Sequence, residues 1–146
     1  GEDAPPSPTT PAAPATPATG TRIGNLLRKD AFHVFRSLCR LSVRSSEGGA
    51  DPFAARGKIL ALELLKMLLE NSGPVFRNSD KLIAAIKQYL CLSLLKNCAS
   101  PVPMAYQKAC SIFVTLVRKF RSSMKAEIGV FFPMILLRPV EGGGAA

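Results

Sequence analysis

The sequence contains few of the residues that usually carry catalysis or base recognition. It has no tryptophan, two tyrosines (Tyr89 and Tyr106) and one histidine, His33. Single-stranded nucleic acid is usually bound by aromatic stacking beside basic charge, so the shortage of aromatic residues disfavours an RNA-binding role. His33 neighbours Phe32 and Phe35 and has no second histidine nearby. We therefore interpret it as a packed or exposed helix residue.

The sequence also lacks the motifs of common enzyme families. It has no GxxxxGK[ST] loop, no GxGxxG, no HExxH and no further histidine that could activate a nucleophile. The acids Glu63 and Glu70 lie seven positions apart on one expected helix, but such a pair is most often a solvated helix face. We therefore expect a protein that is not an enzyme and that needs no cofactor.

Cysteine spacing argues against a metal site or a structural disulfide. The four cysteines are Cys39, Cys91, Cys98 and Cys110, and they include no CxxC pair. Zinc sites usually draw their ligands from such closely spaced pairs. Because three of the four lie within apolar helix patterns, we predict buried free thiols that are kept reduced.

No segment has the length and apolar character of a membrane-spanning helix. The longest strongly apolar run, Ile128–Leu137, has ten residues and is interrupted by Pro133, whereas a spanning helix needs about 20. No secretory signal is present. These features predict a soluble, cytoplasmic protein.

The two ends of the chain differ in composition from the rest. The first 21 residues are mostly proline, alanine and threonine and contain no large apolar residue, so we predict a disordered linker over residues 1–24. Residues 142–146 are expected to form a similar Gly/Ala tail. Because the chain begins with Gly1 and both ends resemble linkers, we expect a piece of a longer polypeptide, with one helical domain over 25–141 that is truncated at its C-terminal end.

Two amphipathic patterns joined by a short turn dominate the expected domain. Between Arg56 and Asn97, leucine and isoleucine recur every three or four residues on both sides of a turn at Ser72–Pro74. This spacing predicts a helical hairpin with one apolar face on each helix. The expected faces comprise Leu60, Leu64, Leu65, Leu68 and Leu69 in the first helix and Leu82, Ile83, Ile86, Leu90 and Leu94 in the second.

Capping residues and turn signals delimit the expected helices. Five helices are predicted: residues 30–44 capped by Asp30, 51–72 capped by Asp51, 79–97 with Asp80 in the first turn, one after Pro103, and one after Ser122 or Ser123. Gly73 is expected to end the second helix in a left-handed conformation. Pro133 is expected to kink the fifth helix, whose apolar face should pack on the fourth.

These patterns predict an all-α fold, because no segment reads convincingly as a strand. About five helices with short turns fit either an armadillo- or HEAT-like helical solenoid or an irregular bundle. A scaffold of either kind is expected to act through its surface rather than through a catalytic pocket.

The part of the chain from Arg22 onward is strongly basic. All 19 lysines and arginines but only eight of the ten acids lie at or after Arg22, which gives this part a net charge of +11. Such a balance favours an acidic partner, whether nucleic acid, an anionic membrane or an acidic protein face. Four basic residues near the end of the fourth helix are candidate contacts for an acidic partner or lipid headgroups: Arg118, Lys119, Arg121 and Lys125. A solvated helix junction is the simpler interpretation.

Three blocks of the sequence resemble one known family. DAFHVFRSLCRLSVR (30–44), GKILALELLKMLLENSGPVFRNSDKLIAAIKQYLCLSLLKN (57–97) and SIFVTLVRKFRSSMKAEIGVFFPMILLRPVE (111–141) are similar, in order and with similar gaps, to the large brefeldin-A-inhibited exchange factors for ARF GTPases. The similarity maps to the homology-upstream (HUS) region, and the FFPMILLR wording is closest to plant and algal members. The catalytic exchange domain with its glutamate finger is absent, as is the Asn-Tyr-Asp-Cys-Asp-like box expected after Glu141.

The resemblance implies an armadillo-like fold and a non-catalytic role. In this family the region is expected to contact the dimerisation domain and the catalytic exchange domain and to respond to small GTPases of the ARF class. The segment would then be a regulatory scaffold, held peripherally at trans-Golgi or endosomal membranes through its parent protein, with no nucleic-acid partner. Two alternatives stay open: a basic helical-repeat nucleic-acid-binding module, and a peripheral membrane module that uses the Ile128–Leu137 face.

Overall fold

The computed structural model describes residues 1, 4–6, 8, 19–44 and 51–142. Within these ranges the regular structure is helical and no strand occurs, so the predicted all-α class is confirmed. The elements are α1 (Thr19–Ser42), α2 (Pro52–Glu70), α3 (Pro74–Arg77), α4 (Asp80–Ala85), the π-helical segment η1 (Ile86–Leu90), α5 (Cys91–Cys98), α6 (Pro103–Lys119) and α7 (Lys125–Gly142). Since α4, η1 and α5 follow one another without a gap, they act as one long helix.

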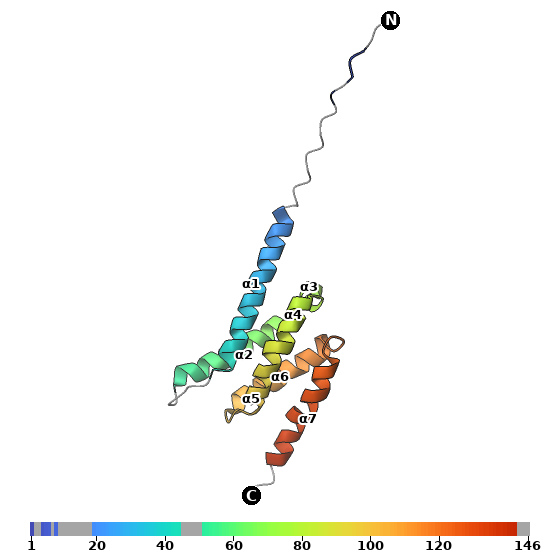
Figure 1. The fold of residues 1–146 in the computed structure, drawn as a ribbon. Coiled ribbons are helices and arrows are strands. Elements are labelled where there is room, and N and C mark those ends of the chain that lie inside the picture. Colours follow the sequence, from blue (N-terminus) through green and yellow to red (C-terminus); the bar gives the residue numbers. More distant parts are fainter. Residues whose placement is uncertain (2–3, 7, 9–18, 45–50, 143–146) are drawn as a thin grey trace.

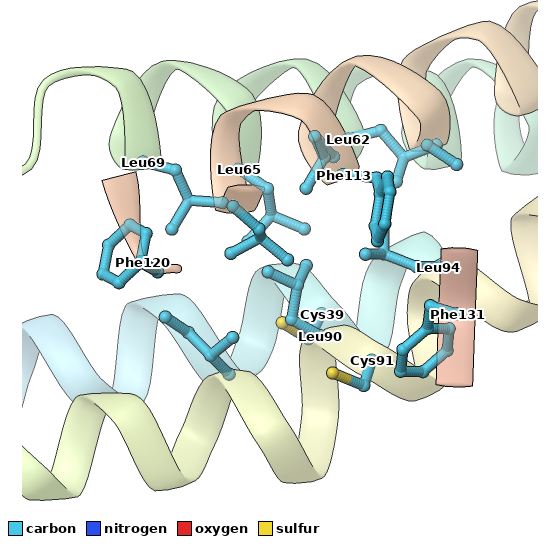
Figure 2. Packing of buried hydrophobic residues seen from close by; sticks show 14 of the residues in the cluster. Cys39, Leu62, Leu65, Leu69, Leu90, Cys91, Leu94, Phe113, Phe120 and Phe131 are labelled. Carbon is cyan, nitrogen blue, oxygen red and sulfur yellow. The ribbon is translucent and has the colours of Figure 1, made fainter. Parts of the chain in front are cut away.

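The helices pack in two layers that close into an irregular bundle. α2 lies against α6 in one layer, and α1 lies against α4, η1 and α5 in the other. Contacts from α1 to α2 and from α5 to α6 join the layers. Figure 2 shows Leu62, Leu65 and Leu69 of α2 pointing toward Leu90 and Leu94 of the opposite layer. Of the two expected arrangements, the described helices form a bundle, and the N-terminal part of α1 extends beyond it (Figure 1).

The core contains most of the residues that the helical spacing predicted. In α4, η1 and α5 four of the five residues of the expected face are confirmed, because Leu82, Ile86, Leu90 and Leu94 are at most 5% exposed, whereas Ile83 is half-buried. Buried residues on α1 and α6 complete the core, together with the residue that follows α6: Phe35, Cys39, Ile112, Leu116 and Phe120. Burial of each large apolar side chain contributes about 1.5–3 kcal/mol, so these faces account for much of the force that closes the bundle.

The inward face of α2 differs from the prediction. Its buried residues are Ala61, Leu62, Leu65 and Leu69. By contrast, Leu60 is 59% exposed and Leu64 is 39% exposed, although both were expected in the core. α2 carries leucine and methionine on two sides, so the three- and four-residue spacing could not decide which side would face the other helices.

Two of the predicted helix boundaries are confirmed by their caps. The Asp51 side chain accepts a hydrogen bond from the Phe53 N–H at 2.9 Å, and Pro52 occupies the first helical position of α2. Ser79 accepts a hydrogen bond from the Leu82 N–H at the start of α4. Polar caps of this type satisfy N–H groups that have no partner inside the helix.

Three other predicted caps were wrong. Asp30 does not cap a helix, because α1 already begins at Thr19 and therefore includes residues 19–24 of the expected linker. Gly73 is not left-handed, since its φ is −89°; α2 ends before Gly73, as expected, but its last residue is Glu70 and its C-cap is Asn71. α7 begins at Lys125, after both expected serine caps. The remaining linker lies largely outside the described residues, as do residues 143–146, and the division into linker, domain and tail stays a prediction.

α7 packs mainly on α5 rather than on α6, so the predicted partner of the last helix was wrong. Phe131 is 7% exposed and lies beside Cys91 and Leu94 in Figure 2. An ion pair of 3.4 Å also joins Lys87 of η1 to Glu127 of α7. α6 already packs against α2 and α5, which leaves the free side of α5 as the apolar surface for α7. The kink expected at Pro133 stays a prediction.

A buried polar cluster joins α1 to α5. Ser42, Ser93 and Asn97 are each 0% exposed. The Asn97 Nδ2 group donates to the carbonyl oxygens of Ser42 at 3.0 Å and Ser93 at 2.8 Å, and the two serine hydroxyls lie 2.5 Å apart. Buried polar groups are costly when they lose their partners, so this cluster favours one axial position of α1 against α5.

Candidate functional site

The outward side of α2 carries an exposed apolar stripe. Phe53, Leu60, Leu64 and Met67 are 77%, 59%, 39% and 50% exposed. Their separations of seven, four and three residues place them along one side of the helix. We call these four residues the outer face of α2. Single exposed apolar residues are common, but an ordered row on one helix is typical of an interaction surface.

An apolar groove borders this face on each side. The first, of about 550 Å³, lies between α1 and α2, and its lining includes Val34, Leu38, Leu64, Met67 and Phe76. The second, also about 550 Å³, lies between α2 and α6 and is lined by Ile59, Leu60 and Met104 together with polar residues. Side chains of a partner helix fit between helices in this way, so the two grooves and the outer face of α2 form one continuous candidate docking surface.

The acids on α2 are engaged in ion pairs rather than arranged for acid and base chemistry. Glu63 is half-buried and forms an ion pair with Lys108 of α6. The Lys108 hydrogen bond holds the pKa of Glu63 below its usual range. Glu70 is exposed and lies 3.8 Å from Lys66. The interpretation as a solvated helix face therefore holds for Glu70, whereas Glu63 helps to join α2 to α6.

The four predicted basic residues lie around the end of α6 but do not share one environment. Arg118, Arg121 and Lys125 are exposed, whereas Lys119 is half-buried. The Lys119 Nζ group donates a hydrogen bond to the carbonyl oxygen of Glu70, the last residue of α2. A cation at this position satisfies a carbonyl that has no partner inside the helix and complements the negative end of the α2 dipole. Lys119 therefore has a structural role that the sequence did not reveal.

A polar pocket of about 270 Å³ opens beside Lys119. Its lining comprises Pro74, Arg77, Asn78, Lys119, Phe120, Ser122 and Ser123. Arg77 is exposed and belongs to α3, a single helical turn that the spacing of apolar residues could not reveal. The pocket thus joins one predicted basic residue to Arg77, which was missed, while Arg118, Arg121 and Lys125 lie outside its lining.

The remaining candidate residues show no reactive arrangement within the described ranges. His33 is exposed on α1 and contacts Phe32 edge-on, as expected. The four cysteines form no disulfide; three are buried and Cys110 is half-buried. Burial raises the pKa of Cys39 to about 12 and that of Cys91 to about 11, so both stay protonated near neutrality. Among the described residues, no three side chains of His, Cys, Asp or Glu come together as a metal site.

Comparison with known proteins identifies close sequence relatives. Residues 27–145 match the family model described as Mon2/Sec7/BIG1-like, HUS domain. The chain is 62% identical over 122 residues to brefeldin A-inhibited guanine nucleotide-exchange protein 2 of Arabidopsis thaliana. The aligned residues make up 82% of this chain and 7% of that protein. It is 47% identical over 125 residues to the human exchange protein 1, covering 84% of this chain and 7% of the relative. The chain therefore spans a small part of the length of these relatives.

Within the part of the chain that the structure describes, none of the helices has both the length and the apolar character needed to cross a bilayer. The apolar run at Ile128–Leu137 lies in α7, where Phe131 is buried while Val130 and Met134 are exposed. This run therefore contributes partly to the core.

Proposed function

Since the chain belongs to the HUS-domain family of Mon2/Sec7/BIG1-like proteins, we propose that it is a non-catalytic regulatory and scaffolding segment of a guanine-nucleotide exchange factor for ARF GTPases. The parent protein would load GTP onto an ARF GTPase in Golgi or endosomal vesicle traffic. This segment would bind other domains of the same protein, and through the parent it would associate peripherally with the membrane from the cytoplasm.

The outer face of α2 is the observation that best supports this role. A row of four exposed apolar residues between two apolar grooves offers a partner helix a surface that resembles a helix–helix interface inside a protein. In the part of the chain that the structure describes, no pocket brings a nucleophile and a base together. Binding of a partner therefore explains the outer face of α2 better than catalysis does. The proposed partners are the upstream dimerisation domain and the downstream catalytic exchange domain of the parent.

Calorimetric titration tests the proposal directly. The chain is titrated with the separately expressed dimerisation domain and, in a second series, with the catalytic exchange domain. We expect saturable binding to at least one of them. Leu60→Glu and Met67→Glu should each weaken that binding by tenfold or more, because burying an unpaired carboxylate in an apolar interface costs well over about 1.4 kcal/mol.

A matched control separates docking from a general effect of charge. Gln88 is exposed on η1, in the other layer of the bundle. Gln88→Glu adds the same charge and should leave the affinity unchanged. Helicity measured by circular dichroism should be the same in all three variants. Binding of Leu60→Glu and Met67→Glu with the affinity of the unsubstituted chain would show that the outer face of α2 is not the docking surface.

The basic residues at the end of α6 support a second contact. We call Arg118, Lys119, Arg121 and Lys125 the basic turn, because they surround the turn between α6 and α7. They are proposed to contact an acidic partner or lipid headgroups, since neighbouring cations attract anionic surfaces. Arg118→Glu combined with Arg121→Glu in the parent protein should reduce membrane recruitment or binding between its domains. If both quantities stay unchanged, these residues form only a solvated helix junction.

A further inference from the structure

The polar pocket beside Lys119 gathers hydrogen-bond donors from segments that lie far apart in the sequence. Arg77 comes from the end of α3, Lys119 from the end of α6, and Ser122 and Ser123 from the turn that leads to α7. The guanidinium group offers five N–H donors in one plane, the ammonium group offers three, and each hydroxyl offers one. Asn78 adds a side-chain amide to the lining.

The charge of the lining has one sign. Among the described residues that line the pocket, two are basic and none is acidic. The nearby acid Glu70 does not cancel this charge, because its carboxylate lies 3.8 Å from Lys66 while its backbone carbonyl accepts the hydrogen bond from Lys119. That hydrogen bond holds the ammonium group of Lys119 in place and leaves two of its three N–H donors for a ligand.

We propose that this pocket binds a phosphomonoester, presented as the phosphorylated headgroup of an inositol lipid at a membrane surface. A planar guanidinium group recognises phosphate through two parallel hydrogen bonds, and a lysine ammonium adds a point charge, so Arg77 and Lys119 together suit a doubly charged phosphate. This inference deepens the proposed contact role of the basic turn and does not depend on the outer face of α2.

The surroundings of the pocket favour a lipid over a soluble anion or a phosphorylated peptide. Arg118, Arg121 and Lys125 are exposed around the same turn, and cations close to an anionic bilayer are attracted to it. Val130 and Met134 of α7 are 62% and 52% exposed and lie four residues apart, on one side of the helix that follows the basic turn. Basic residues followed by exposed apolar residues are typical of surfaces that bind the interface of a bilayer.

Vesicle co-sedimentation of the full 146-residue chain tests the inference. One set of phosphatidylcholine vesicles carries a phosphatidylinositol monophosphate, and a second set carries phosphatidylserine at the same surface charge. We expect clearly tighter binding to the first set. Arg77→Gln should weaken that binding about tenfold, because it removes the guanidinium group that would bind the phosphate through two charged hydrogen bonds. Ser122→Glu should weaken it at least as much, because it places a negative charge at the pocket.

Two matched variants separate the pocket from general attraction of charge. Arg40→Gln removes an exposed arginine from α1, and Arg118→Gln removes one from the basic turn outside the pocket lining. We expect the first to have no effect and the second to weaken binding about twofold to fivefold, as for one cation near an anionic surface. Equal losses in Arg77→Gln and Arg118→Gln, with preserved helicity, would overturn the pocket as a specific site.

Titration with soluble ligands distinguishes a lipid headgroup from free phosphate and from a phosphorylated peptide. The chain is titrated calorimetrically with inorganic phosphate, with the water-soluble inositol phosphate headgroup and with a phosphoserine peptide. The proposal is supported if the soluble headgroup binds more weakly than the vesicles and if Arg77→Gln abolishes this weak binding. Binding of inorganic phosphate or of the peptide at the strength of the vesicles would overturn the assignment to a lipid. Loss of docking in Leu60→Glu with retained vesicle binding would show that the two surfaces act separately.

Discussion

The two sides of α2 have similar side chains but opposite environments. On the inward side, Leu62, Leu65 and Leu69 are 0% exposed and contact the rest of the bundle. On the outward side, Leu60 and Met67 are at least half exposed between two apolar grooves. Apolar spacing therefore marks a surface suited to burial without indicating what covers it. In α2 one side closes the domain, and the other is available to a partner.

The largest expected effect comes from shortening a leucine on the inward side. Leu65→Ala should lower the free energy of unfolding by about 2–5 kcal/mol, because it removes buried apolar atoms and leaves a cavity. Leu60→Ala makes the same change on the outward side of the same helix and should cost about 1 kcal/mol or less. Urea unfolding of both variants measures the two values. Equal losses would mean that both sides of α2 are part of the core.

Polar side chains should show the same difference between buried and exposed positions. Asn97→Ala should lower the free energy of unfolding by about 1–3 kcal/mol, because the buried carbonyls of Ser42 and Ser93 lose a donor. Asn71 is exposed at the end of α2, where its Nδ2 donates to the Met67 carbonyl at 2.7 Å. Asn71→Ala should cost about 0.5 kcal/mol, since water replaces that donor. A loss at Asn97 no larger than at Asn71 would contradict a stabilising role for the buried cluster.

The smallest expected effect concerns the buried thiols at high pH. Burial raises the pKa of Cys39 to about 12, so above a pH of about 9 the unfolded chain releases a proton that the folded protein retains. Stability should therefore fall as pH rises from about 9 toward 12. Between about pH 8 and pH 10 we expect a loss of about 1 kcal/mol from this thiol.

Urea unfolding in the presence of a reductant measures that dependence. Cys39→Ala should make the decline with pH shallower. Cys110→Ala, at the half-buried cysteine of α6, is the matched control. If the two variants show the same decline, the ionisation of Cys39 does not contribute to it.

Sequence reasoning was most successful where a helix has one apolar face and a recognisable cap. Ile86, Leu90 and Leu94 are buried as predicted, because polar residues occupy the other sides of that helix at many positions. Asp51 and Pro52 start α2 as predicted, because capping depends on residues close together in the chain. Reasoning failed for the start of α1, where Asp30 offered a plausible cap inside a longer helix.

The candidate sites were predicted less completely, because each depends on residues from separate segments. The basic residues near the end of α6 were visible as a cluster, but the role of Lys119 depends on its contact with Glu70 of α2. Arg77 joins the same pocket from α3, more than forty positions earlier in the chain. No local signal connects the two positions, since neither apolar spacing nor a motif spans that distance.

The all-α class, the principal helices, the strongly basic charge and the family of the chain can all be inferred from its residues in order. These properties depend on composition, on local spacing and on the order of similar blocks. Three other properties emerge only from the folded structure: α2 turns Leu65 inward and Leu60 outward, α7 packs on α5, and Arg77 lies with Lys119 at one pocket. Those results depend on how all the helices pack together so that the least apolar area stays exposed. This packing is a property of the whole assembly of helices.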